Sequence, residues 1–126
     1  LYDQVLIKNN HIAAAGGVEA ALQRCHQYLR AHGLELFVTV EARTLEEVEA
    51  ILRHGGANRI LLDNMDLGTL RRAVSLIGGR MQTEASGNVT LQNVRPIAET
   101  GVDYISIGEL THSAPNLDVS LELRLL

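Results

Sequence analysis

Charged or small polar residues stand at the end of each of five short apolar runs along the chain. They are Lys8, Glu41, Asp63, the pair Glu84 and Ser86, and Gly108. An unpaired charge at the end of a buried strand is unfavourable unless it meets water or a partner. One such residue could simply mark where a strand leaves the core. Its recurrence after every run indicates a binding site instead.

The side-chain types of these residues limit the chemistry. Paired carboxylates such as Glu41 and Asp63 can bind Mg²⁺ through oxygen atoms or accept hydrogen bonds from sugar hydroxyl groups. Lys8 can attract a carboxylate or a phosphate group as a point charge. We therefore take Lys8, Glu41 and Asp63 as candidate catalytic and substrate-binding residues, with Glu41 and Asp63 as candidate metal ligands.

Two small-residue turns lie beside these acids. "EASGNVT" (84–90) precedes a predicted helix, whose free N–H groups and dipole attract anions such as phosphate. "SIGELTHS" (106–113) repeats the arrangement, with Gly108 allowing close backbone approach and His112 available beyond it. His11 is close to Lys8 in the sequence. It either helps bind a substrate or has its ring nitrogens hydrogen-bonded to the loop backbone, and the sequence leaves both open.

Strand-like and helix-like segments alternate along the chain. The predicted strands are residues 4–8, 35–41, 59–63, 80–85 and 103–108. The predicted helices run from 17 to 33, from a capping box at Thr44 and Glu47 to Gly55, from Asp66 to Gly78, and from Thr90 to Gly101. Pro96 inside the last helix predicts a kink or a displaced boundary.

This alternation predicts βα units around a parallel sheet, with all strand ends on one rim. "RILLD" (59–63) predicts a strand buried on both faces. A doubly wound sheet would also fit, but no glycine-rich nucleotide motif is present, which favours a barrel. We predict an α/β fold whose parallel βα repeats form part of an incomplete TIM-like barrel. The tail "LDVSLEL" (117–123) alternates like a strand that pairs outside the repeats.

Composition narrows the class of protein. The 126 residues are 46% apolar and 21% charged, which is typical of a globular domain, and the net charge of −4 argues against a broad nucleic-acid surface. We expect no membrane span and no secretory signal. Cys25 has the helical spacing of a core residue rather than a reactive thiol. A single cysteine fits a reducing compartment, so we expect a cytoplasmic protein, and the missing initiator methionine suggests a longer one.

Several segments together resemble one enzyme family. "VLIKNNHIAAAGG", "VEARTLEE", "ILLDNM", "EASGNVTLQNV" and "ETGVDYISIGELTHSAPNLDVSLEL" are similar to the C-terminal barrel domain of the quinolinate phosphoribosyltransferases, in order and over essentially all of residues 1–126. The resemblance implies transfer of phosphoribose from phosphoribosyl pyrophosphate to quinolinate with loss of CO₂, giving nicotinate mononucleotide for NAD synthesis. It also implies Mg²⁺ and a homodimer or higher homo-oligomer.

The resemblance also implies roles for individual residues. Lys8 would lie near the substrate's carboxylates and phosphates, while Glu41 and Asp63 would face the ribose and the Mg²⁺–pyrophosphate. The 5′-phosphate would be bound by two loops, which contain Ser86, Gly87, Asn88, Gly108 and His112. The chain departs from the common pattern at four positions, which are Asn9, Thr39, Asn88 (often glycine) and Glu109.

Two other interpretations stay open from the sequence. One is a pyrophosphorylase-like homologue associated with molybdate transport, and the other is an inactive barrel fragment. In the family, basic residues that bind the carboxylates of quinolinate lie upstream of the segment that residues 1–126 resemble. We therefore expect residues 1–126 to be inactive on their own.

Overall fold

The computed structural model describes residues 4–9, 12, 16–107 and 120–121. Its strands form one six-stranded sheet in the order β1-β2-β3-β4-β5-β6. They are β1 Gln4–Ile7, β2 Phe37–Ala42, β3 Arg59–Asp63, β4 Gln82–Ser86, β5 Tyr104–Ser106 and β6 Ser120–Leu121. The helices are α2 Val18–Ala31, α3 Leu45–His54, α4 Leu67–Ile77 and α5 Val94–Ala98.

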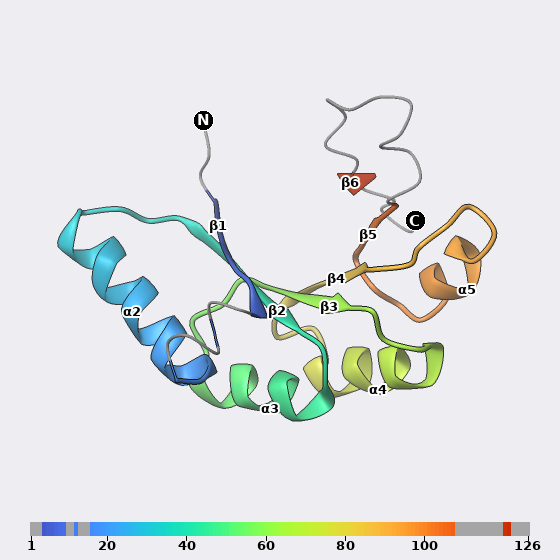
Figure 1. The fold of residues 1–126 in the computed structure, drawn as a ribbon, viewed down its shortest axis with the longest axis horizontal. Coiled ribbons are helices and arrows are strands. Elements are labelled where there is room, and N and C mark those ends of the chain that lie inside the picture. Colours follow the sequence, from blue (N-terminus) through green and yellow to red (C-terminus); the bar gives the residue numbers. More distant parts are fainter. Residues whose placement is uncertain (1–3, 10–11, 13–15, 108–119, 122–126) are drawn as a thin grey trace.

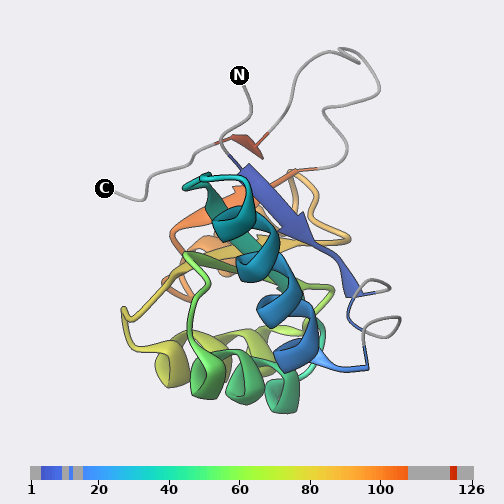
Figure 2. The same cartoon turned by 90° about the vertical axis from the view of Figure 1, so that its left-hand side faces the viewer.

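The sheet is wound in one direction. Strands β1 to β5 are parallel and follow chain order, so each pairs with the next in the sequence. Helices α2, α3 and α4 lie side by side on the same face of the sheet, and α5 lies against α4 and β5 (Figure 1 and Figure 2). A doubly wound sheet would reverse its strand order and carry helices on both faces. The prediction of a parallel α/β fold that forms part of a barrel is confirmed.

Local sequence sets where the helices begin and end. The Thr44 side chain accepts a hydrogen bond from the Glu47 amide and Glu47 accepts one from the Thr44 amide, which confirms the predicted capping box. The Asp66 carboxylate caps α4, and Gly78 ends it in the left-handed conformation. Helix α5 begins only at Val94, which leaves Pro96 in the first turn, where its missing N–H is not needed.

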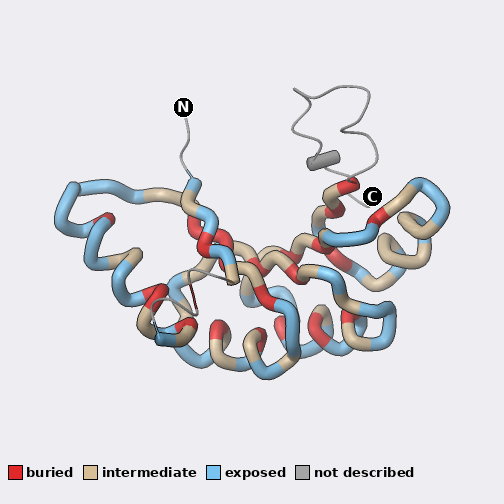
Figure 3. Tube along the Cα trace, in the orientation of Figure 1, coloured by how far each residue is buried: buried red, intermediate tan, exposed pale blue. Residues whose placement is uncertain are grey.

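The hydrophobic core fills the space between the sheet and the helices. Buried and half-buried positions alternate along the strands, as the colours of Figure 3 show. Ile60, Leu62 and Val40 are 1% exposed or less. Their neighbours Arg59, Leu61 and Asp63 are only half-buried. The prediction that "RILLD" is buried on both faces is therefore wrong for the described chain, because the helices cover one face only.

The tail prediction is also wrong. β6 pairs with β5, the last strand of the repeats, and runs antiparallel to it, with Ile105 opposite Leu121. An unpaired edge of β5 would expose a row of backbone N–H and C=O groups, and β6 supplies partners for them. Within the part of the chain that the structure describes, no helix is long and apolar enough to cross a membrane.

Ile51 provides a test of the one-sided core. Its side chain is fully buried in α3, so Ile51→Ala should lower the free energy of unfolding by about 2–5 kcal/mol. Leu91 is 60% exposed, and Leu91→Ala should change the free energy of unfolding by less than about 0.5 kcal/mol. Urea unfolding of the full-length protein measures both, and equal effects would contradict this packing.

Asp66 makes the stability depend on pH. A hydrogen bond of 2.8 Å from the Thr69 amide lowers the pKa of the Asp66 carboxyl below its usual value. A lowered folded-state pKa stabilises the protein above the unfolded pKa, and this contribution is lost as the pH falls through the folded value. Asparagine caps without titrating, so Asp66→Asn should flatten the acid limb of stability between pH 5 and pH 3, roughly the range in which carboxyls titrate. Urea unfolding at a series of pH values measures this dependence. The same loss of unfolding free energy with falling pH in the wild type and in Asp66→Asn would count against this role.

Candidate active site

The strand register sets a row of polar side chains at the carboxyl end of the sheet. Ala42 pairs with Leu62, so Arg43, one residue further on, lies level with Asp63, and Asp63 pairs with Ser86. We call Arg43, Asp63 and Ser86 the rim row. Glu41 points to the same side as Arg43, since side chains alternate along a strand, but it lies one pleat deeper. These residues occupy the face of the sheet opposite the helices.

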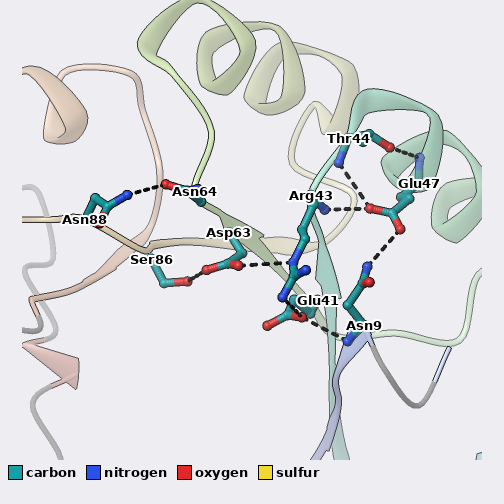
Figure 4. Close-up of polar contacts among 9 residues, drawn as sticks. All are labelled: Asn9, Glu41, Arg43, Thr44, Glu47, Asp63, Asn64, Ser86 and Asn88. Atoms are coloured by element: carbon teal, nitrogen blue, oxygen red, sulfur yellow. Dashed lines mark hydrogen bonds and ion pairs between the residues drawn. The ribbon is translucent and has the colours of Figure 1, made fainter. Parts of the chain in front are cut away.

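Arg43 lies between the two candidate catalytic acids (Figure 4). Its Nη2 is 3.7 Å from Glu41 Oε1, and its Nε is 3.4 Å from Asp63 Oδ2. The side chains of Glu41 and Asp63 are 12% and 22% exposed, whereas that of Arg43 is 56% exposed. The structure thus brings the predicted carboxylate pair together around one cation that was not among the predicted site residues.

Glu41 is oriented by the loop after β1. The backbone N–H of Asn9 donates to Glu41 Oε1 at 2.9 Å, and the Asn9 side-chain amide donates to Glu47 Oε2 at 2.9 Å. The other oxygen of Glu47 accepts from the backbone N–H groups of Arg43 and Thr44. One carboxylate at the start of α3 therefore ties the loops after β1 and β2 together.

Asp63 is oriented by the last residue of β4. The Ser86 hydroxyl donates to Asp63 Oδ1 at 3.1 Å, and the backbone N–H of Asn64 donates to the Ser86 carbonyl at 2.8 Å. The Asn88 side chain donates to that of Asn64 at 2.6 Å. Asn64 and Asn88 both have left-handed backbones, with φ of 56° and 55°. Asparagine tolerates this conformation, which explains how Asn88 can stand where glycine is common.

Gly87 allows these two loops to touch. A Cβ atom on this residue would lie 2.9 Å from Asn64 N and 3.0 Å from Asp63 Oδ1, and the φ of +83° also disfavours a side chain. Gly87 is predicted from the sequence to bind phosphate. The structure adds a packing reason for glycine at the same position.

The helix after this loop is shorter than expected. Helix α5 has five residues and begins at Val94 rather than after Thr90. Reciprocal hydrogen bonds between Thr90 and Asn93 form a turn that separates Gly87 and Asn88 from the helix. The predicted helix start after Thr90 is therefore three residues too early, although the Val94 amide still donates to the Thr90 carbonyl at 3.0 Å. A phosphate there would depend on the loop groups of residues 86–88 and not on a helix dipole.

Glu84 is engaged within the sheet. Its carboxylate accepts from Arg59 Nη1 at 2.9 Å and from the Ser106 hydroxyl at 2.6 Å. Arg59 also lies over the rings of Tyr104 and Phe37, at 3.9 and 5.2 Å from their centroids, and donates to Gln82. This network extends down the sheet from Ser106, which is level with Ser86, to Arg59 and Gln82, which lie two pleats below the rim row. Glu84 thus stabilises the sheet beneath the site.

The remaining candidates divide into placed and unplaced residues. Lys8 is exposed directly after β1 and lies level with Glu41, because Ile7 pairs with Val40. His11, Gly108 and His112 lie outside the described residues. Cys25 packs against the core, and burial raises the pKa of its thiol, as expected for a structural cysteine. Arg43 was missed, although its spacing of two from Glu41 is the signal for a shared strand face.

Gly87 and Gly79 form a matched pair for testing the loop contact. Both have φ near +80°, but nothing lies within 4 Å of a Cβ built on Gly79. Gly79→Ala should cost only the backbone strain, about 1–2 kcal/mol. Gly87→Ala should cost at least about 1 kcal/mol more because of the added clash. Urea unfolding of the full-length protein gives both values, and equal losses would contradict the close approach.

Comparisons with known proteins agree with this geometry. Residues 1–122 match the family model described as "Quinolinate phosphoribosyl transferase, C-terminal domain". The chain is 50% identical to the mitochondrial quinolinate phosphoribosyltransferase [decarboxylating] 2 of Nicotiana glauca, over 98% of its own length and 39% of the relative's. It is 47% identical to the chloroplastic nicotinate-nucleotide pyrophosphorylase [carboxylating] of Arabidopsis thaliana, with the same coverage. The chain thus spans about two fifths of these relatives.

A solved structure has the same fold. The crystal structure of nicotinate-nucleotide pyrophosphorylase from Ehrlichia chaffeensis superposes with a TM-score of 0.80 at 42% identity, over 90% of this chain and 39% of that one.

The names of the plant relatives contradict the expected cytoplasmic location, since they specify mitochondria and chloroplasts. A lone cysteine cannot form an intrachain disulfide in any compartment, so it was a poor guide to location. The chain belongs to the quinolinate phosphoribosyltransferase family.

Proposed function

We propose that the protein containing this chain transfers phosphoribose from phosphoribosyl pyrophosphate to quinolinate and releases pyrophosphate and CO₂, giving nicotinate mononucleotide. The chain would form the C-terminal part of the barrel domain. Family membership supports the reaction. The observation that carries the proposal is the convergence of Glu41 and Asp63 on Arg43, beside the loop of Ser86 and Gly87.

The chemistry explains why acids are needed at this rim. The pyridine nitrogen of quinolinate donates its lone pair to C1 of the ribose, while the bond from C1 to the pyrophosphate oxygen breaks and its electrons leave with pyrophosphate. Positive charge develops on the ribose as this bond weakens. Carboxylates held in fixed orientation, as Glu41 and Asp63 are, stabilise that charge without having to reorganise.

Loss of CO₂ completes the reaction. The carboxylate next to the ring nitrogen leaves as CO₂, its electron pair stays on the ring carbon, and that carbon takes up a proton. Lys8, exposed at the level of Glu41, is proposed to attract the anionic groups of the substrates. Ser86, Gly87 and Asn88, together with Gly108 and His112, are proposed to bind the 5′-phosphate, and His11 to contact the substrate.

Glu41 and Asp63 also suit a magnesium ion. Mg²⁺ is usually bound by one or two carboxylates together with waters and substrate phosphates. The described residues offer two converging carboxylates and no cluster of three or more metal-ligating side chains, which fits such a shared site. When bound there, Mg²⁺ would neutralise charge on the leaving pyrophosphate. We further propose a homodimer or higher homo-oligomer, on the ground of membership of this family alone.

Isosteric variants of the two acids test the proposal. In the full-length protein, Glu41→Gln and Asp63→Asn should each lower kcat/KM for nicotinate mononucleotide formation by about 100-fold or more, because each removes a charge that stabilises the transition state. Glu49→Gln, which changes an exposed acid on α3, should leave kcat/KM unchanged. Near-normal turnover in either site variant would remove these residues from the mechanism. A wild-type protein without this activity would refute the proposed function.

A further inference from the structure

Arg59 and Arg43 both lie on the face of the sheet opposite the helices, which we call the inner face. Their contacts differ in length and in exposure to water. Arg59 contacts Glu84 at 2.9 Å, and both side chains are 14% exposed. Two aromatic rings and Gln82 fix Arg59 further. Arg43 contacts its two acids at 3.4 and 3.7 Å with a side chain that is 56% exposed. Long, exposed ion pairs contribute little to stability, so Arg43 can leave its position at small cost.

The two acids do not need Arg43 to stay oriented. Glu41 accepts the Asn9 backbone N–H at 2.9 Å, and Asp63 Oδ1 accepts the Ser86 hydroxyl at 3.1 Å. The second oxygen of Asp63, Oδ2, is the one that faces Arg43. Removal of the guanidinium would therefore expose carboxylate oxygens that already point toward the same space.

We propose that Arg43 is an internal counter-ion for Glu41 and Asp63, which a divalent cation displaces when it binds between them. This inference rests on the cation role given to the two acids under the proposed function. Two carboxylates that converge in one site repel each other, and a nearby positive charge relieves that repulsion. Arg43 would supply the charge in the cation-free protein and would oppose cation binding for the same reason.

Cation affinity in the absence of substrates tests this role directly. Mn²⁺ serves as the probe, because electron paramagnetic resonance measures free Mn²⁺ during a titration of the full-length protein. Arg43→Ala and Arg43→Gln should each bind Mn²⁺ roughly 3- to 20-fold more tightly than the wild type, as expected for removing one positive charge a few ångströms from a dication. Arg43→Lys keeps the charge and should stay close to the wild type.

Arg53 provides the matched control. It lies exposed in the last turn of α3, about 13 Å along the helix from its capped end, and Arg53→Ala makes the same change in net charge. This variant should leave Mn²⁺ affinity unchanged. Glu41→Gln and Asp63→Asn should weaken binding at least several-fold if the acids are the ligands. Circular dichroism checks that the variants keep the fold.

The outcomes separate this inference from the proposed function. Unchanged or weaker Mn²⁺ binding in the Arg43 variants would overturn the counter-ion role, as would equal tightening by Arg53→Ala. If Asp63→Asn still weakens binding in that case, the cation role of the acids stands. If Asp63→Asn has no effect on Mn²⁺ binding, both the cation role and the counter-ion role fall. Loss of affinity for phosphoribosyl pyrophosphate in Arg43→Ala, with unchanged Mn²⁺ affinity, would make Arg43 a substrate ligand instead.

Discussion

Burial of one face of the sheet against the helices is the constraint on which the rest of the structure depends. Val40, Ile60 and Leu62 lie on the face that packs against the helices, and each is at most 1% exposed. Alternation along each strand then forces their neighbours onto the opposite face. Glu41 and Asp63 lie there for that reason, and the parallel register brings them to adjacent strand ends. The position of the charged site is thus a consequence of the position of the apolar core.

Most of the fold could be predicted from the sequence, since strand and helix periods, Thr44, Asp66 and Gly78 are local signals. The carboxylate pair also followed from strand ends alone. Contacts between loops could not be predicted in this way. The bonds from Asn9 to Glu41 and Glu47, and from Asn88 to Asn64, join residues that are 24 to 38 positions apart. Burial on both faces of β3 was overestimated because composition does not reveal how many faces the helices cover.

The polar side chains of the inner face form two layers of different stiffness. In the lower layer, which lies beneath the rim row, Arg59 and Glu84 make a short contact and are largely shielded from water, and the Ser106 hydroxyl donates to Glu84 from the level of the rim. In the rim row, Arg43 makes longer contacts and is exposed. A rigid lower layer fixes the spacing of β3, β4 and β5, so the strand ends keep their positions while side chains at the rim rearrange.

Glu47 couples the start of α3 to the site. Its two oxygens accept from the Thr44 and Arg43 amides on one side and from the Asn9 side chain on the other. Helix ends fray more easily than sheets unfold, and the opening of such a local unit costs less free energy than global unfolding. Each opening of the first turn of α3 therefore frees Asn9, which also orients Glu41. Local opening of this turn would therefore loosen the orientation of Glu41 before the sheet itself unfolds.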